Sequence, residues 1–244
     1  MAEEEGIVQP LKGKSAPELG PVAVMAATRT DFDDLCRRLN RDPENGRWLF
    51  TSRLLIKDGE PALVGPLVGA PYAVMVLETL IAWGASRFVF AGWCGAVSPK
   101  LKIGDLLLPD AALVDEGTSS HYLPDAVQPE HRCLPSTDIF RAIERALVGV
   151  GAPFRKGAVW STDGIYRETP SRVCRFRDRG AMAVEMEVSA LFTVASYRKV
   201  AVGAALVVSD DLSELKWVPG FRDPRFQKGR RALCDAIGKL CLSL

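Results

Sequence analysis

The chain has 244 residues, of which 48% are hydrophobic and 25% are charged, and its formal net charge at pH 7 is +1. This length is enough for one large domain with a filled core. A near-neutral charge excludes the strongly basic surface that nucleic-acid or anionic-membrane binding requires, and no apolar run approaches the roughly 18 residues of a membrane span. We therefore expect small-molecule partners, and neither a nucleic-acid nor a membrane partner.

The N-terminus and the cysteines bear on organisation and compartment. The chain begins with an acidic segment that has no apolar signal region, so residues 1–20 are predicted to be an N-terminal arm and residues 21–244 a single domain. The six cysteines form no C-x-x-C pair, and a reduced, cytoplasmic protein is the simplest interpretation. With two histidines and no clustered thiols, we expect no metal site.

Hydrophobic periodicity divides the domain into strands and helices that alternate. In chain order we predict a strand at 21–27, a helix capped by Thr30 and running to Leu39, strands at 47–57 and 61–64, a helix at 71–83, strands at 87–91, 102–108 and 111–115, a helix capped by Ser136, a strand at 156–160, helices at 172–179 and from 188, a strand at 201–208, and a last helix from Pro224. This alternation, with several consecutive strands, predicts an α/β fold of three layers, in which helices flank a mixed central sheet.

Two stretches place carboxylates beside apolar residues. Glu185 and Glu187 precede a run with the spacing of a buried helix, and the apolar strand 201–208 ends at Ser209-Asp210-Asp211. Ligands of α/β proteins bind at the carboxyl ends of strands. Two interpretations stay open: a ligand site, or solvated Glu185 and Asp211 with Glu187 and Asp210 capping backbone amides.

The segment Gly92-Trp93-Cys94-Gly95-Ala96 follows a predicted strand. A dinucleotide-binding turn would require a helix directly after it, but another strand is predicted there. The glycines therefore either let backbone amides approach a ligand or form a tight turn.

Four stretches together resemble the nucleoside phosphorylase-I family, which holds purine nucleoside phosphorylases, uridine phosphorylases and nucleosidases that use water. The resemblance runs from about residue 21 to the C-terminus. The stretches are Gly69-Ala70-Pro71, Gly92-Trp93-Cys94-Gly95-Ala96 followed by Ile103-Gly104-Asp105, Val184-Glu185-Met186-Glu187, and Val208-Ser209-Asp210. The resemblance implies a phosphorylase-like fold, phosphate as co-substrate without a further cofactor, and a homo-oligomer, either a dimer or a hexamer.

The resemblance also implies roles for individual residues. Glu187 matches the glutamate that accepts hydrogen bonds from the ribose hydroxyls, Met186 matches the methionine against the sugar, and His121 lies in a loop that approaches the ribose or the nucleophile. Asp210 matches the general acid that protonates N7 of a purine, which the uridine branch lacks, so the base is expected to be a purine. Residues expected to contact the base are Ile165, where the family has an aromatic ring, Tyr166, Glu185 and Trp93.

The chain departs from the family where phosphate binds. Phe90 stands in place of an arginine, and Trp93 in place of a serine or threonine hydroxyl. The remaining phosphate ligands would be Arg29, Thr28 and the backbone near Gly95, with Arg47 or Arg53 of a neighbouring subunit as a possible addition. Replacing a guanidinium and a hydroxyl by two apolar rings weakens an anion site.

The primary expectation is phosphorolysis of a purine nucleoside to free base and sugar 1-phosphate. The alternatives are a nucleosidase that uses water and a family member that binds nucleoside without catalysis. Trp217 either closes over the base or anchors its loop in the core.

Overall fold

The computed structural model describes residues 6–10, 12, 16–123 and 131–242, so part of the predicted N-terminal arm lies outside the described residues. The strands are β1 (Val22–Ala26), β2 (Arg47–Leu49), β3 (Ser52–Leu55), β4 (Ala62–Gly65), β5 (Arg87–Ala96), β6 (Leu106–Asp115), β7 (Arg132–Cys133), β8 (Phe154–Thr162), β9 (Ala181–Glu185), β10 (Ala201–Asp211) and β11 (Val218–Pro219). The helices are α1 (Arg29–Arg38), α2 (Ala70–Ala82), α3 (Thr137–Gly149), α4 (Pro170–Asp178), α5 (Val188–Arg198) and α6 (Pro224–Cys241).

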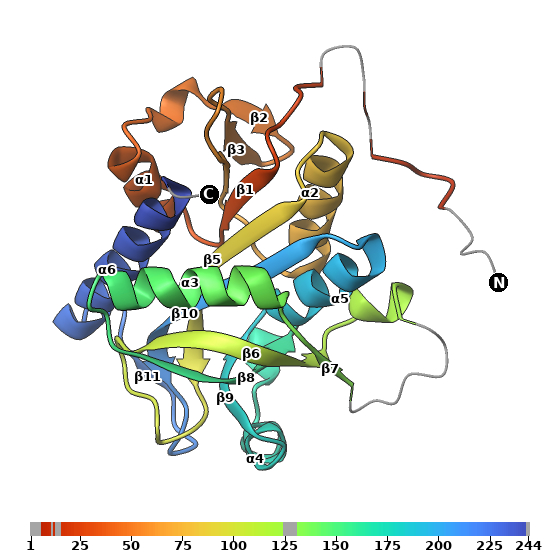
Figure 1. Ribbon diagram of the computed structural model, residues 1–244. Coiled ribbons are helices and arrows are strands. Elements are labelled where there is room, and N and C mark those ends of the chain that lie inside the picture. Colours follow the sequence, from red (N-terminus) through yellow and green to blue (C-terminus); the bar gives the residue numbers. More distant parts are fainter. Residues whose placement is uncertain (1–5, 11, 13–15, 124–130, 243–244) are drawn as a thin grey trace.

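A single mixed sheet forms the centre of the molecule (Figure 1). Strands β4, β1, β5 and β10 are parallel to one another. Strand β10 also pairs with β6, β6 with β8, β8 with β9, and β9 pairs back onto β5. These five strands therefore close a ring, and β1, β4, β3 and β2 extend from it. The predicted mixed sheet is confirmed, and its closure into a ring is a finding of the structure.

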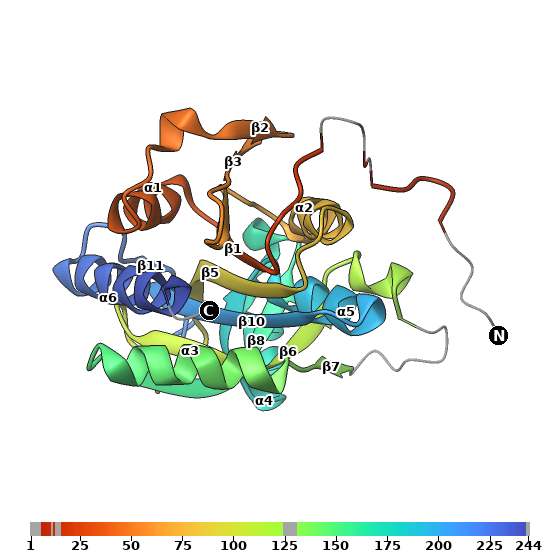
Figure 2. The same cartoon turned by 45° about the horizontal axis from the view of Figure 1, so that its top comes forward.

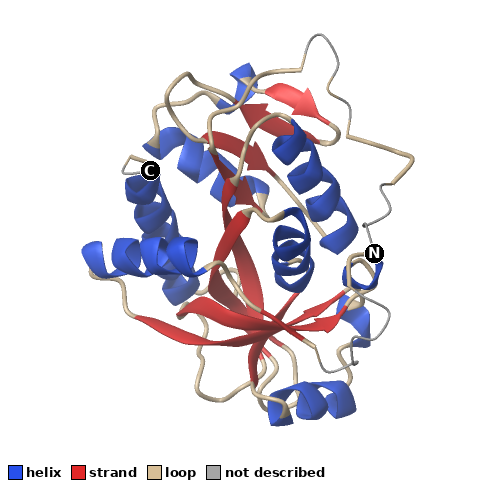
Figure 3. Cartoon of the chain, turned by 45° about the vertical axis from the view of Figure 1, so that its right-hand side comes forward, coloured by secondary structure: helices blue, strands red, loops and turns tan. Residues whose placement is uncertain are grey.

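Helices cover both faces of the sheet, which confirms the three-layer prediction (Figures 2 and 3). Helices α2 and α5 pack against each other over one core, whereas α1, α3 and α6 bury their apolar sides in a second core. Residues 188–195 of α5 are all buried, so this helix is enclosed on every side and does not merely present one apolar stripe. No helix of the described residues is long and apolar enough to cross a bilayer.

Two local predictions were wrong, and one of the two alternatives for segment 92–96 is excluded. The cap of α1 is Thr28 and not Thr30, because the Thr28 side chain accepts a hydrogen bond from the Asp31 amide. The predicted strand 47–57 is a hairpin, since the chain reverses at Phe50-Thr51 between β2 and β3. The segment 92–96 is no turn: β5 runs straight through it and pairs with β10 and β9.

The parallel strands of the ring end on one side of the molecule. Strand β10 carries a bulge there, because Val208 pairs with Cys94 and Asp210 pairs with the next residue, Gly95, which leaves Ser209 as the extra residue. Bulges change the direction of a side chain and are common beside functional sites. Residues at the carboxyl ends of β1, β9 and β10 and in the second half of β5 thus lie together at the place where the sequence carries its carboxylates.

Candidate active site

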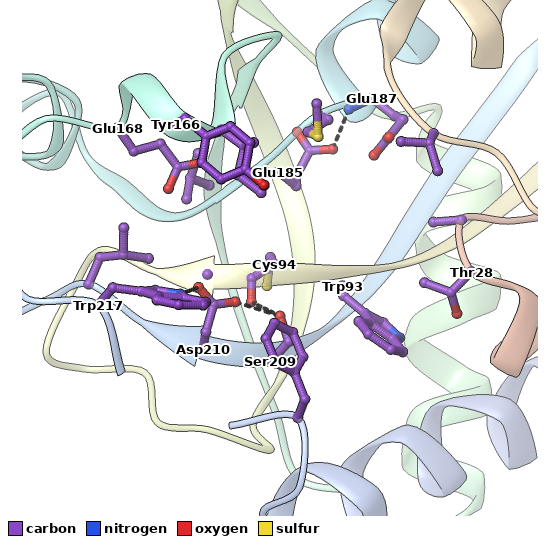
Figure 4. A pocket seen from close by; sticks show the side chains of 18 of the residues that line it. Thr28, Trp93, Cys94, Tyr166, Glu168, Glu185, Glu187, Ser209, Asp210 and Trp217 are labelled. Atoms are coloured by element: carbon purple, nitrogen blue, oxygen red, sulfur yellow. Dashed lines mark hydrogen bonds between the residues drawn. The ribbon is translucent and has the colours of Figure 1, made fainter. Parts of the chain in front are cut away.

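A cavity of about 620 Å³ lies at these strand ends (Figure 4). It receives side chains from residues far apart in the sequence, including β5, the loop after β8, and the ends of β9 and β10. The predicted site residues that line it are Thr28, Trp93, Gly95, Ile165, Tyr166, Glu185, Met186, Glu187 and Asp210. The structure therefore brings together the residues that the resemblance singled out for base and sugar, together with part of the expected acceptor site.

Glu185 is buried and its two carboxylate oxygens are both engaged. One oxygen accepts a hydrogen bond from the Ser161 hydroxyl, and the other accepts from the amides of Glu187 (2.7 Å) and Val188 (2.8 Å). Burial raises the pKa of this carboxyl to about 7, and these hydrogen bonds act in the opposite direction. Glu185 thus caps the first turn of α5, and the interpretation of Glu185 as a solvated side chain was wrong.

Glu187 stands at the N-cap of α5 and is also buried. One of its oxygens accepts a hydrogen bond of 2.6 Å from the Gly69 amide, at the start of α2. The pKa of the Glu187 carboxyl is raised to about 8, chiefly by burial and then by the neighbouring charge of Glu185, while backbone hydrogen bonds oppose the increase. A buried carboxylate with one anchored oxygen is suited to accept hydrogen bonds from hydroxyl groups of a ligand.

Asp210 lies across the cavity from Glu187 (Figure 4). Its two oxygens accept hydrogen bonds from the Ser209 hydroxyl (2.6 Å) and from the Trp217 indole N–H (2.9 Å). A Cβ atom placed on Gly95 would lie 3.1 Å from one of these oxygens and 2.7 Å from Leu212 Cδ1. The glycine therefore permits the close packing of β5 against this carboxylate, and it does not serve the tight turn that was one of its two alternatives.

One end of the cavity holds a carboxylate that was not among the predicted site residues. Glu168 follows the 3₁₀ turn Ile165–Arg167 and lines the cavity on the side opposite Asp210 (Figure 4). The pKa of Glu168 is raised to about 7, chiefly by burial and then by the charge of Asp210, while the charge of Arg172 opposes the increase. In the sequence Glu168 stands between Arg167 and Thr169 in a polar segment. The only signal for a role at the cavity is that it follows β8, one of the five strands of the closed ring.

Trp93 borders the other end of the cavity, beside Thr28 (Figure 4). Its indole N–H donates a hydrogen bond of 2.5 Å to Asp31, and Arg230 of α6 donates to the second Asp31 oxygen, also at 2.5 Å. Asp31 is fully buried, and this burial raises its pKa while the pairing with Arg230 opposes the increase. Neither Asp31 nor Arg230 was singled out from the sequence.

Two predicted site residues lie elsewhere. Arg29 does not line the cavity, and its guanidinium pairs with Asp33 (2.7 Å) and Glu44 (3.2 Å). His121 lines a second cavity, of about 1060 Å³, between α2, α5 and the segment around Val8. Phe90 is fully buried in the core beneath α2 and α5 and also does not reach the cavity.

The electrostatic character of the cavity is acidic. Its described lining contains the carboxyl groups of Glu168, Glu185, Glu187 and Asp210 and no lysine, arginine or histidine. Among the described residues no cluster of three or more potential metal ligands was found. Such a lining favours ligands with many hydrogen-bond donors, such as sugar hydroxyls and the N–H groups of a nucleobase.

Comparisons with known proteins agree with this arrangement. The family model described as the phosphorylase superfamily matches residues 21–235. The guanosine phosphorylase of Halorubrum lacusprofundi is 28% identical over 145 residues, which are 59% of this chain and 58% of that protein. A DeoD-type purine nucleoside phosphorylase of Jannaschia sp. is 31% identical over 151 residues, which are 61% of this chain and 62% of that protein. The chain thus matches about three fifths of the length of these relatives.

Solved structures support the same fold. The purine nucleoside phosphorylase of Toxoplasma gondii, in complex with immucillin-H, is similar with a TM-score of 0.77 at 20% identity, covering 93% of this chain and 92% of that chain. The AMP nucleosidase of Bacteroides thetaiotaomicron is similar with a TM-score of 0.68 at 25% identity, covering 88% and 87%. Because the family model spans nearly the whole domain and the fold agrees, the chain belongs to the phosphorylase superfamily.

Proposed function

We propose that the protein cleaves the N-glycosidic bond of a nucleoside whose base is a purine. The observation that carries this proposal is the placement of Glu187 and Asp210 on opposite sides of one cavity (Figure 4). One carboxylate is positioned for the sugar and the other for the base, so the bond between them lies in the middle of the cavity.

Glu187 binds the ribose in this proposal. Its carboxyl accepts a hydrogen bond from the Gly69 amide and also receives those of the 2′- and 3′-hydroxyls, and Met186 supplies apolar contact beneath the sugar ring. Hydrogen bonds from hydroxyls to a carboxylate contribute roughly 1.5–3 kcal/mol each. The sugar gains positive charge as the bond breaks, and nearby carboxylates stabilise that charge.

Asp210 acts on the leaving base. Breaking the bond leaves an electron pair on the base nitrogen, and a proton delivered to N7 of a purine removes the resulting negative charge. Ser209 and Trp217 hold the Asp210 side chain in a fixed orientation, and Glu168 offers an additional acceptor for the N–H groups of the base. A pyrimidine has no N7, so Asp210 could not assist its departure by protonating that position.

Relatives supply the reaction class. The two curated relatives are named as phosphorylases of guanosine and of purine nucleosides, whereas the similar AMP nucleosidase is named for hydrolysis. Both classes share the cleaved bond and differ in the acceptor. The proposal therefore concerns glycosidic cleavage of a purine nucleoside.

The test is chromatographic detection of free base after incubation with adenosine, inosine, guanosine or uridine, each with and without phosphate. We expect release from at least one purine nucleoside and none from uridine. Asp210→Asn should reduce the rate by about 100-fold or more, because the acid is lost. Asp211→Asn is the matched control: this neighbouring aspartate accepts a hydrogen bond from the Ser213 amide (2.8 Å), which an asparagine oxygen can replace. Binding of nucleosides without any release would favour the non-catalytic alternative.

A further inference from the structure

The end of the cavity away from the proposed base is walled by a large side chain. A nucleophile attacks the sugar from the side opposite the base, and the cavity is bordered by Thr28 and Trp93 on the side away from Glu168 and Trp217 (Figure 4). The Trp93 indole therefore forms the wall at the end from which a nucleophile would attack.

Trp93 is held firmly in this place. Its N–H donates to the buried Asp31, which is itself paired with the buried Arg230. The indole ring also makes an edge-to-face contact with Phe226, at a centroid distance of 4.9 Å, and a tilted contact with Phe221 at 6.1 Å. Displacing the indole would leave the Asp31 carboxylate with one fewer donor in a buried environment, which is costly.

The lining also offers phosphate no positive charge. Phosphate carries at least one negative charge, and the described cavity lining supplies no cationic side chain. Arg230, whose Nε donates to Asp31 at 2.5 Å, is not part of that lining. Water is small and neutral, and it both donates and accepts hydrogen bonds in such a lining.

We propose, on the basis of the glycosidic cleavage set out above, that Trp93 closes the phosphate subsite and thereby makes water the acceptor. Trp93 is then a specificity-determining residue, and Asp31 is a positioning residue that acts through it. In the reaction the C1′–N bond breaks and its electron pair stays on the base. Asp210 delivers a proton to N7 of that base. A water oxygen bonds C1′ and loses one proton to solvent by way of a cavity carboxylate, and solvent returns a proton to Asp210. The products are free base and free sugar.

The first test uses the wild-type protein in water enriched in the heavy oxygen isotope, across a phosphate titration. We expect a rate of base release that changes less than about twofold with phosphate, and heavy oxygen at C1 of the released sugar. Phosphate-dependent release with accumulation of sugar 1-phosphate would overturn the inference and leave glycosidic cleavage standing. No release under any condition would overturn both.

The second test asks whether Trp93 is the residue that prevents phosphate from binding. Binding of inorganic phosphate is measured by calorimetry, without nucleoside. Trp93→Ser removes the indole and adds a hydroxyl, whereas Trp93→Phe keeps a six-membered aromatic ring and loses the five-membered ring with its N–H group. We expect phosphate binding to be undetectable in the wild type and in Trp93→Phe, and at least about tenfold tighter in Trp93→Ser. Equal phosphate binding by all three folded proteins would refute the role of Trp93. If Trp93→Ser fails to fold, the isotope experiment still decides the acceptor.

Discussion

At the scale of single residues, the two glutamates of the Glu185-Met186-Glu187 segment have different tasks although they are two positions apart. Glu185 ends β9, and its two oxygens accept hydrogen bonds from the Ser161 hydroxyl and from the first amides of α5. One Glu187 oxygen accepts a hydrogen bond from the Gly69 amide. The same residue type therefore serves structure at one position, and at the other it is available for a ligand.

This difference can be tested with a matched pair of isosteric variants. Glu187→Gln replaces the carboxyl group by a neutral amide that also donates, and we expect kcat/KM for a purine nucleoside to fall by about 100-fold, which corresponds to roughly 2.7 kcal/mol, with little change in melting temperature. Glu185→Gln cannot satisfy three donors equally well, so its melting temperature should fall by several degrees, as for the loss of about 1 kcal/mol or more. Steady-state kinetics and thermal unfolding of both variants decide the matter. Equal kinetic losses in two equally stable variants would contradict this division of tasks.

At the scale of elements, the bulge in β10 and the loop that follows it determine the base end of the cavity. The bulge at Ser209 places Asp210 beside Gly95, and the loop returns through Trp217 to β11, where Asp210 pairs with Pro219. The Trp217 ring is 63% exposed, yet its N–H reaches Asp210. An exposed ring tied to the proposed acid is well placed to cover a bound base.

For this loop we expect Trp217→Ala to raise KM for the purine nucleoside by about tenfold, because stacking of an aromatic ring on a base contributes roughly 1–3 kcal/mol. Trp217→Phe keeps a stacking ring but cannot donate to Asp210, so it should recover most of the KM. Kinetic constants of both variants separate the two contributions. A KM that stays at the wild-type value in Trp217→Ala would show that the ring is only a structural anchor.

At the scale of the whole molecule, burying several carboxyl groups at one end of the sheet affects stability. Burial raises the pKa of Glu168 and Glu185 to about 7 and that of Glu187 to about 8, above the ordinary value of 4.5 that each regains on unfolding. Between these values the folded state binds more protons than the unfolded state. The free energy of unfolding therefore falls as pH rises from about 4.5 to about 8 and changes little above that.

We expect urea denaturation of the ligand-free protein at a series of pH values to show a free energy of unfolding that falls across this pH window. Glu168 contributes less to this pH dependence of the free energy of unfolding than a fully buried carboxyl would, because it is partly exposed to solvent. Glu187→Gln carries no charge to bury, so its stability should vary less with pH. A wild-type stability that rises between pH 5 and 8, with the same slope in Glu187→Gln, would rule out this linkage.

Much of the fold follows from local pattern. The buried α5 and the strand before Asp210 were predictable, because apolar spacing reports burial on a helix or strand. The cap of α6 by Asp223 was also predictable, because the capping residue and the proline after it are neighbours in sequence. The bulge at Ser209 and the closure of the ring were not, because both depend on the register between strands far apart in the chain.

The sequence by itself determined the class of the fold, its family and the carboxylates Glu187 and Asp210 as candidates for sugar and base. Those features depend on residue types and short spacings. Only the tertiary structure decided that Glu185 is a helix cap, that Glu168 faces Asp210, and that Arg29 lies outside the cavity. It also decided the contact of Trp93 with Asp31, 62 positions away, and of Asp31 with Arg230, 199 positions away. The physical reason is that burial and pairing of charges depend on which distant segments the closed sheet brings together, and no local pattern records that.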